Sequence, residues 1–162
     1  MKVGTLVATA AATTATAVLG GLATDPGSRW YRRLKKPEWQ PPAVAFPVVW
    51  TALYADIAVS SAAALDGVPE EDWPEGQVAY RRALAINLAL NAAWSWLFWR
   101  TRRPWLAAAE SAVLTASSAA LVRRTFGINR AAGAALAPYA LWCAFATVLS
   151  AAIAKANPRS GG

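Results

Sequence analysis

Residues 30–54, WYRRLKKPEWQPPAVAFPVVWTALY, join two apolar segments and are rich in aromatic, basic and proline residues. Prolines at positions 37, 41 and 42 remove backbone donors and disfavour helix in the residues before them. A stiff, extended, basic connector is therefore expected over residues 25–45. Pro47 suits the first turn of the helix that follows. In that helix Trp50 and Tyr54 are four residues apart and share a face, which is expected to contact something flat or apolar.

Composition indicates a membrane protein. The 162 residues are 56% hydrophobic, include nine tryptophans and carry a formal net charge of +7. Apolar runs long enough to cross a bilayer end in basic residues and are flanked by tryptophans, as at membrane edges. Because the basic residues are not gathered on one polar face, no nucleic-acid partner is expected. The expected partner is the lipid bilayer.

The chain has no histidine and a single cysteine, Cys143. This excludes a disulfide framework or zinc site within one chain, a histidine general base and histidine ligation of haem iron. No metal site, no acid–base catalytic set and no required cofactor are expected.

The apolar runs predict five helices in a single domain of residues 1–162. Their expected ranges are residues 3–24, 46–65, 80–100, 104–124 and 131–155. The first run could instead be a signal peptide, with Lys2 as its basic region and Gly21-Leu22-Ala23 as a cleavage site. Small residues on the first and fourth helices would allow a homodimer.

Basic residues also predict an orientation. With five crossings, six basic residues lie on the side of the N-terminus and ten on the other side. The positive-inside rule then predicts a cytoplasmic C-terminus. Richness in Ala, Arg and Trp hints at a bacterial cell membrane.

Polar and aromatic residues share a stripe on the third helix. At 100° per residue, Asn87, Asn91, Trp94 and Phe98 fall on one face and Trp96 on the opposite face. Unsatisfied amides are unfavourable in hydrocarbon, so the stripe is expected to face the bundle interior. The asparagines could serve only as interhelical hydrogen-bonding groups.

The last helix presents a similar stripe, made of Pro138, Trp142, Phe145 and Leu149 with Ala146 at its edge. Together with the second and third helices it offers inward-facing rings and a few polar groups. Such a wall suits a flat apolar ligand held by stacking and one or two hydrogen bonds. The alternative is ordinary packing of a tryptophan-rich bundle.

Asp56 and Glu110 are the only acids within the apolar runs. Asp56 should lie on the side of its helix away from Trp50 and Tyr54. For Asp56, a polar contact with another helix or a second subunit is favoured over a proton path, because no further acid or histidine continues a relay.

Four blocks of sequence, in order, carry a resemblance. They are W-Y-x-x-L-x-K-P-x-W-x-P-P at 30–42, F-P-x-V-W-T-x-L-Y at 46–54, L-A-L-N-A-A-W-S at 88–95 and P-Y-A-L-W-C-A-F-A-T-V-L at 138–149. This pattern resembles the TspO/MBR family, which comprises the tryptophan-rich sensory proteins and the translocator protein or peripheral benzodiazepine receptor. The resemblance implies an all-α integral membrane bundle of five transmembrane helices around an apolar pocket. The family motifs explain neither Asp56 nor Glu110.

The resemblance also implies a receptor or sensor that binds tetrapyrroles such as protoporphyrin, by their ring faces. Its ligand-binding positions, with Phe98 added from the stripe above, are Trp50, Tyr54, Asn91, Trp94, Phe98, Trp142, Ala146 and Leu149. Connector residues Tyr31, Trp39 and Pro42 would close over the pocket. Basic residues between positions 32 and 36 could meet the propionates of a porphyrin.

Two other functions are implied by the same resemblance. One is light-dependent or oxidative porphyrin degradation, with Trp50 and Trp142 as photochemical candidates. The other is porphyrin or sterol transport, which the lack of an internal repeat disfavours. Ala151 stands where animal members carry the tyrosine of a cholesterol-recognition pattern, so sterol binding through that segment is doubtful. Ser150 replaces the family's usual asparagine.

Overall fold

The computed structural model describes residues 1–158, which form helices and connecting segments without a strand. The long helices are α1 (Val3–Ala23), α3 (Ala45–Asp66), α4 (Glu75–Trp99), α5 (Pro104–Ile128) and α6 (Arg130–Ala156). A short helix, α2 (Arg29–Arg33), and a single 3₁₀ turn, η1 (Glu70–Asp72), lie in the connections. The expected all-α fold is confirmed.

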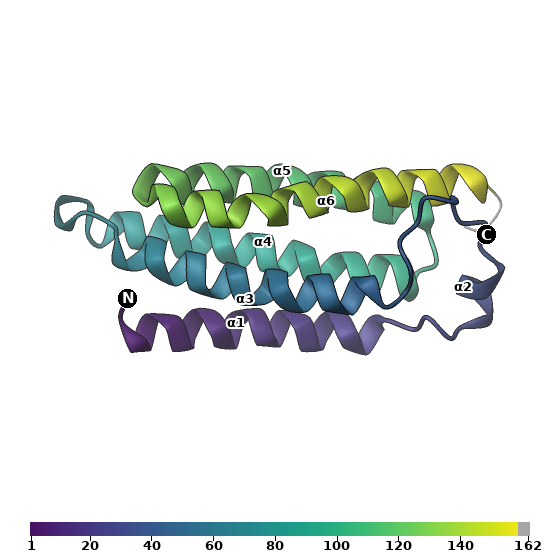
Figure 1. The fold of residues 1–162 in the computed structure, drawn as a ribbon, viewed down its shortest axis with the longest axis horizontal. Coiled ribbons are helices and arrows are strands. Elements are labelled where there is room, and N and C mark those ends of the chain that lie inside the picture. The colour runs from purple at the N-terminus through teal and green to yellow at the C-terminus, as the bar shows by residue number, and fades with distance from the viewer. Residues whose placement is uncertain (159–162) are drawn as a thin grey trace.

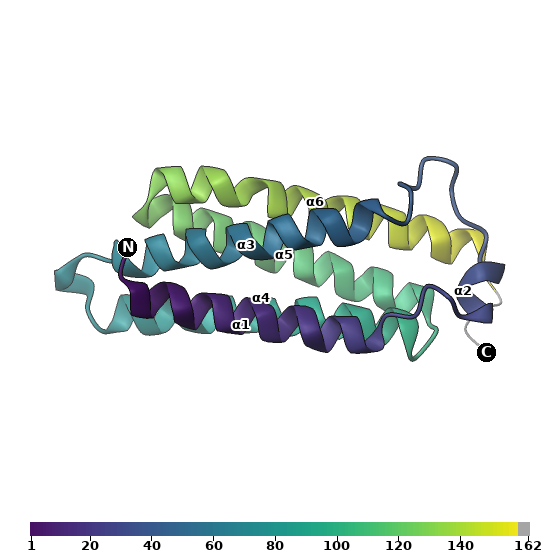
Figure 2. The same ribbon diagram turned by 60° about the horizontal axis from the view of Figure 1, so that its bottom comes forward.

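The long helices run side by side in alternating directions (Figures 1 and 2). The N-terminus, the loop with η1 and the α5–α6 turn lie at one end of the bundle, and α2 lies at the other end (Figure 1). Helix α1 packs against α3 and α4, α3 packs against α6, and the most extensive contact joins α5 to α6. We refer below to the N-terminal end and the α2 end.

Hydropathy supports four crossings, one fewer than expected. Helices α1, α3, α5 and α6 are long and apolar enough to cross a membrane. Helix α4 is 25 residues long, but its first turns carry Glu75, Arg81 and Arg82. The part of α4 without charged residues, 83–99, also contains the polar residues Asn87, Asn91 and Ser95.

Three expectations about element bounds are wrong. Helix α4 begins five residues before position 80, because charged residues at its exposed start are compatible with helix although they interrupt the apolar run. Helix α5 continues four residues past position 124, where buried Thr125 bonds the Leu121 carbonyl at 2.8 Å and Tyr80 at 2.8 Å. The connector is not extended throughout, since Ser28 caps the short helix α2.

Helix α1 joins the bundle through small side chains. Thr9, Thr13, Thr16 and Gly20 are buried along one face. The Thr9 hydroxyl donates to the Ala58 carbonyl of α3 at 2.8 Å. Small residues allow close helix approach in lipid, where apolar burial alone does not drive association. The first apolar run is therefore a packed member of the bundle.

Asn129 ends α5 and caps α6. Its side-chain oxygen accepts a hydrogen bond from the Ala132 backbone N–H at 3.0 Å. An Asn129→Ala variant is expected to lose about 1 kcal/mol of unfolding free energy, because one N-terminal donor loses its partner. SDS titration of the detergent-purified protein, followed by circular dichroism, measures this loss. Asn129→Ser should behave nearly as wild type, and equal losses in both variants would contradict the capping role.

Candidate ligand-binding site

Rings from α2 and α4 gather at the α2 end of the bundle. Trp94 stacks on Phe98 with ring centroids 5.2 Å apart and planes 11° apart. Trp30 meets Phe98 edge-on at 5.4 Å, and Tyr31 contacts Trp99 at 4.6 Å. Phe98 is 3% exposed, which makes it the ring around which the others pack.

A second row of rings joins α3 to α6. Trp50 lies 5.4 Å from Tyr54 and 6.4 Å from Tyr139. One turn nearer the α2 end, Phe46 meets Trp142 at 6.1 Å. The connector reaches this row through Trp39, whose ring lies 6.0 Å from Phe145. Phe46 and Phe145 also pack against the cluster that contains Phe98 and Leu149, so the two rows adjoin. We call them together the aromatic cluster.

A chain of buried hydrogen bonds lies beside the aromatic cluster. The Tyr54 hydroxyl donates to Asn91 Oδ1 at 2.6 Å, and Asn91 Nδ2 donates to the Tyr139 hydroxyl at 3.2 Å. That hydroxyl in turn donates to Asn87 Oδ1 at 2.7 Å. Asn87 Nδ2 reaches the hydroxyls of Ser117 at 3.1 Å and Ser118 at 3.0 Å. The network therefore ties together α3, α4, α5 and α6.

Some polar atoms in the same region have no partner. Trp30 Nε1, Trp94 Nε1 and Gln40 Oε1 are buried and form no hydrogen bond within residues 1–158. Buried polar groups in proteins are nearly always paired, so each such exception calls for a physical reason. Here the exceptions are two donors and one acceptor from α2, α4 and the connector.

The stripe expected on α4 is confirmed. Asn87 and Asn91 are 0% and 5% exposed, whereas Trp96 on the opposite face is 43% exposed and donates to the Leu19 carbonyl of α1. Both asparagines make interhelical hydrogen bonds, which was the simpler of their two expected roles.

The stripe expected on α6 is displaced by about one residue. Pro138 is exposed, while its neighbour Tyr139 is fully buried and holds the centre of the polar network. Tyr139 was missed, although its spacing of three and four residues from Trp142 and Cys143 places it on their face. Trp142 and Ala146 are partly buried and Leu149 is buried.

The expected closing residues of the connector have different environments. Tyr31 is partly buried on α2 and its ring lies 6.3 Å from that of Phe98. Trp39 is 50% exposed. Pro42 is exposed and lies just before α3. The structure therefore brings Tyr31 and Trp39 to the aromatic cluster and leaves Pro42 exposed.

The two acids in the apolar helices, Asp56 and Glu110, differ in whether their carboxylates have a hydrogen-bond partner. Asp56 is half-buried and accepts a hydrogen bond from Ser60 on its own helix at 2.9 Å. Both carboxylate oxygens of Glu110 are buried without a partner within residues 1–158. Glu110 precedes Ser117 by seven residues and Trp94 follows Asn87 by seven. Because Asn87 bonds Ser117 across the antiparallel α4–α5 pair, Glu110 and Trp94 lie at the same level.

Comparison with known proteins identifies the family. The sequence profile of the TspO/MBR family matches residues 7–156. The chain belongs to the TspO/MBR family. It is 37% identical to "Uncharacterized membrane protein YtaB" of Bacillus subtilis over 79% of this chain and 80% of the relative. Identity is 35% with "Tryptophan-rich protein TspO" of Chlorobaculum tepidum, covering 82% of each chain.

The TspO/MBR match extends to animal proteins. The chain is 30% identical to "Translocator protein" of Homo sapiens over 81% of this chain and 76% of the relative. Family membership and the apolar helices together establish a multi-pass membrane protein. The four sequence blocks that carried the resemblance lie in α2 and the connector, α3, α4 and α6, the same segments that form the aromatic cluster.

Proposed function

We propose that this TspO/MBR protein is a membrane receptor or sensor that binds a tetrapyrrole, such as protoporphyrin, in the aromatic cluster. The observation that carries the proposal is the group of unpartnered polar atoms on Trp30, Trp94 and Gln40 among flat aromatic rings. A buried donor without a partner costs about 1–3 kcal/mol. A flat ligand with polar substituents would stack on the rings and supply partners for these atoms.

Stacking would supply most of the affinity. Each well-placed aromatic pair contributes about 0.5–1.5 kcal/mol beyond the area it buries. The rings already contact one another, as Trp94 and Phe98 do, so the ligand would replace ring–ring contacts with ring–ligand contacts. Rigid neighbours favour this exchange, because Tyr54 and Asn91 are held by the polar network and lose little freedom on binding.

Charge at the edge of the cluster suits an anionic substituent. Lys36 Nζ lies 4.3 Å from the centroid of the Tyr31 ring and donates to the Tyr31 carbonyl at 2.7 Å. This cation is therefore held beside the cluster and could pair with a propionate. Glu110, at the level of Trp94, would accept a hydrogen bond from a ligand N–H.

The proposal includes five crossings, with α4 as the fifth. Residues 83–99 of α4 are uncharged and span about 25 Å at 1.5 Å per residue. This is at the short limit for a bilayer core of about 30 Å.

The charge distribution favours a cytoplasmic C-terminus in a bacterial cell membrane. Asp56, on α3, is the residue that a second copy of the chain would contact in a homodimer.

Tryptophan quenching tests the site. Protoporphyrin IX added to detergent-purified protein should quench tryptophan fluorescence saturably. Trp94→Phe keeps a ring but removes the unpartnered N–H, so we expect an affinity about tenfold weaker, equal to about 1.4 kcal/mol. Trp50→Phe and Trp142→Phe should also weaken binding. Trp105→Phe is the matched control, because Trp105 is 59% exposed on α5 and should leave the affinity unchanged.

The outcome also distinguishes binding from chemistry. Saturable quenching in the dark with no loss of porphyrin absorbance under light supports a receptor. Loss of absorbance under light that needs Trp50 or Trp142 would show porphyrin degradation instead. Equal affinity in the Trp94 and Trp105 variants would place the ligand outside the aromatic cluster and refute the site.

A further inference from the structure

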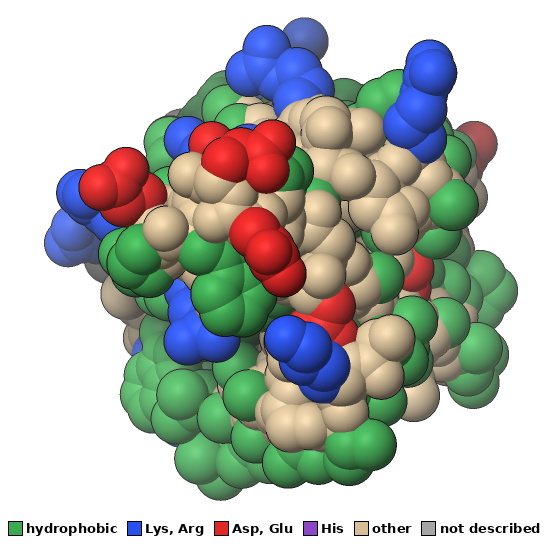
Figure 3. Space-filling model, turned by 90° about the vertical axis from the view of Figure 1, so that its left-hand side faces the viewer, with side chains coloured by type: hydrophobic (Ala, Val, Ile, Leu, Met, Phe, Trp, Pro, Cys, Tyr) green, Lys and Arg blue, Asp and Glu red, His purple; other side chains and the backbone are tan. Residues whose placement is uncertain are grey.

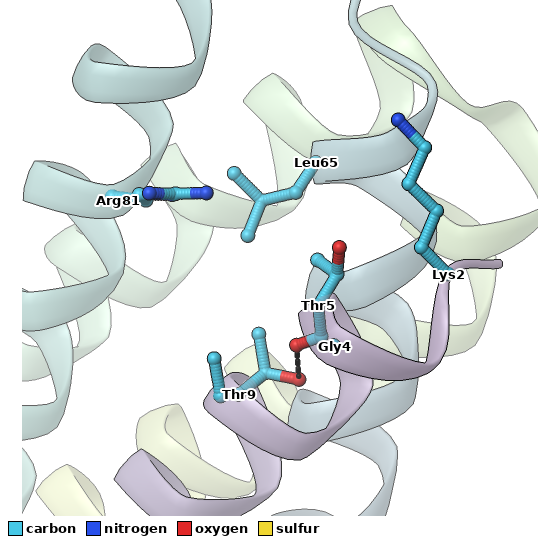
Figure 4. Close-up of a pocket in the computed structure, with 7 residues that line it drawn as sticks. Lys2, Gly4, Thr5, Thr9, Leu65 and Arg81 are labelled. Carbon is cyan, nitrogen blue, oxygen red and sulfur yellow. Dashed lines mark hydrogen bonds between the residues drawn. The ribbon is translucent and has the colours of Figure 1, made fainter.

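A cavity of about 530 Å³ lies at the N-terminal end of the bundle, away from the aromatic cluster. Its walls come from the first turns of α1, the end of α3 and the start of α4. Figure 4 shows Arg81 and Leu65 on one side of the space and Thr5 and Thr9 on the other. The volume falls within the range of about 300–1,000 Å³ that small-molecule sites occupy.

Small residues of α1 leave this space open. Ala8 lines the cavity and is exposed, and Gly4 lines it one turn earlier. A Cβ added to Gly4 would meet nothing within 4 Å.

The wall hydroxyls are already paired. Thr5 donates to Asp66 at 2.7 Å, and Thr9 donates to the Ala58 carbonyl at 2.8 Å. Asp66 also accepts from the Lys2 backbone N–H, so this acid is engaged with the start of α1. A wall of methyl groups, methylenes and satisfied hydroxyls favours an apolar guest such as an acyl chain.

Cations stand at the same level as the cavity. Arg81 is exposed and forms no hydrogen bond or ion pair within residues 1–158. Figure 4 shows its guanidinium directed toward Leu65. Lys2 also lines the cavity, and its ammonium lies 5.1 Å from the centroid of the Trp73 ring. An unpaired guanidinium beside an apolar space suits a phosphate joined to a hydrocarbon chain.

The acidic residues at the N-terminal end of the bundle do not neutralise the positive charge of Arg81 and Lys2 at its perimeter. Figure 3 shows Asp and Glu side chains gathered over the middle of this end, with Lys and Arg side chains mostly around them. Glu75 begins α4, and Arg81 follows six residues later, about 9 Å deeper along the helix at 1.5 Å per residue. The arginine therefore lies nearer than the acidic loop to the level of lipid headgroups.

We propose that this cavity binds an anionic phospholipid, with the phosphate at Arg81 and Lys2 and part of an acyl chain between α1 and α4. Basic pockets between membrane helices bind lipid headgroups in this way. The site is independent of the aromatic cluster, because the two lie at opposite ends of the bundle. Its failure would leave the proposed receptor function untouched.

Native mass spectrometry of the full-length protein in detergent tests the proposal. Dioleoyl phosphatidylglycerol should be retained at about tenfold lower concentration than dioleoyl phosphatidylcholine. Arg81→Gln should remove that preference, and Ala8→Phe, which fills the cavity, should weaken retention of both lipids. Arg123→Gln, an exposed arginine on α5 outside the cavity, is the matched charge control and should keep the preference.

Each other result overturns the proposal. Equal retention of the two lipids would show that the site does not recognise an anionic headgroup. Equal loss of the preference in the Arg81 and Arg123 variants would show that it comes from diffuse surface charge. Unchanged lipid retention in Ala8→Phe would show that the acyl chain does not bind in the cavity. If Ala8→Phe does not fold, as judged by circular dichroism, Gly4→Leu replaces it. Displacement of the lipid by glycerol phosphate alone would show that the acyl chain contributes nothing and would also refute the site.

Discussion

An Asn87→Ala variant is expected to lose about 1–3 kcal/mol of unfolding free energy. Asn87 is 0% exposed and bonds Tyr139, Ser117 and Ser118. Truncation removes the acceptor of the Tyr139 hydroxyl and the donor that reaches Ser117 and Ser118, and it opens a small cavity. SDS titration in detergent micelles, followed by circular dichroism, measures the loss. Ile86→Ala, at a 50% exposed position on the same helix, is the control and should lose much less.

A double-mutant cycle separates the hydrogen bond from the packing. Tyr139→Phe removes the hydroxyl that Asn87 accepts from, so Asn87→Ala should be less destabilising in that background. We expect a coupling energy of about 0.5–2 kcal/mol between the two positions. Strict additivity would mean that the Tyr139–Asn87 hydrogen bond does not stabilise the bundle, and the loss in Asn87→Ala would then come from its volume and from its bonds to Ser117 and Ser118.

Gly133→Ala is expected to destabilise the protein by about 1–3 kcal/mol, although alanine is the better helix former. A Cβ at this position would lie 2.4 Å from the Phe126 Cα and 2.5 Å from its backbone nitrogen. Backbone atoms cannot rotate away, so α5 and α6 would have to move apart along their extensive contact. The same SDS titration reports the change.

Gly127→Ala is the matched control for that substitution. Gly127 is in the last turn of α5, and an added Cβ would meet nothing within 4 Å. Alanine should therefore be neutral there or stabilise the helix by up to about 1 kcal/mol. Alanine is thus expected to destabilise the protein at position 133 but not at position 127, and equal effects would contradict the close approach at Gly133.

The aromatic cluster could be predicted from the sequence in part. The spacing of Asn87, Asn91, Trp94 and Phe98 was enough to place these residues on one inward face, because a helix turns by a fixed angle per residue. On α6 the same rule predicted that Pro138, and not Tyr139, would face inward. Helical spacing alone gives the direction of a face only to within about one residue. Tyr139 became identifiable only once α6 was placed against α3 and α4.

Charge pattern alone misplaced the ends of two helices. Residues 75–79 of α4 were left out because the polar loop was expected to continue through position 77, and residues 125–128 of α5 were left out because Arg123 and Arg124 end its apolar run. Helix is maintained through these residues by backbone hydrogen bonds, whatever the polarity of the side chains, and by contacts such as Tyr80 with Thr125.

The sequence by itself determined the all-helical class, the membrane setting, the family and the inward faces of α3 and α4. Each follows from composition, from periodicity along one helix or from an ordered set of motifs. Only the tertiary structure decided which polar groups pair, which remain unpartnered and where the cavity at the N-terminal end lies. These features depend on the rotation and level of each helix relative to its neighbours. Close contacts such as that of Gly133 with Phe126 set them, and no single helix encodes them.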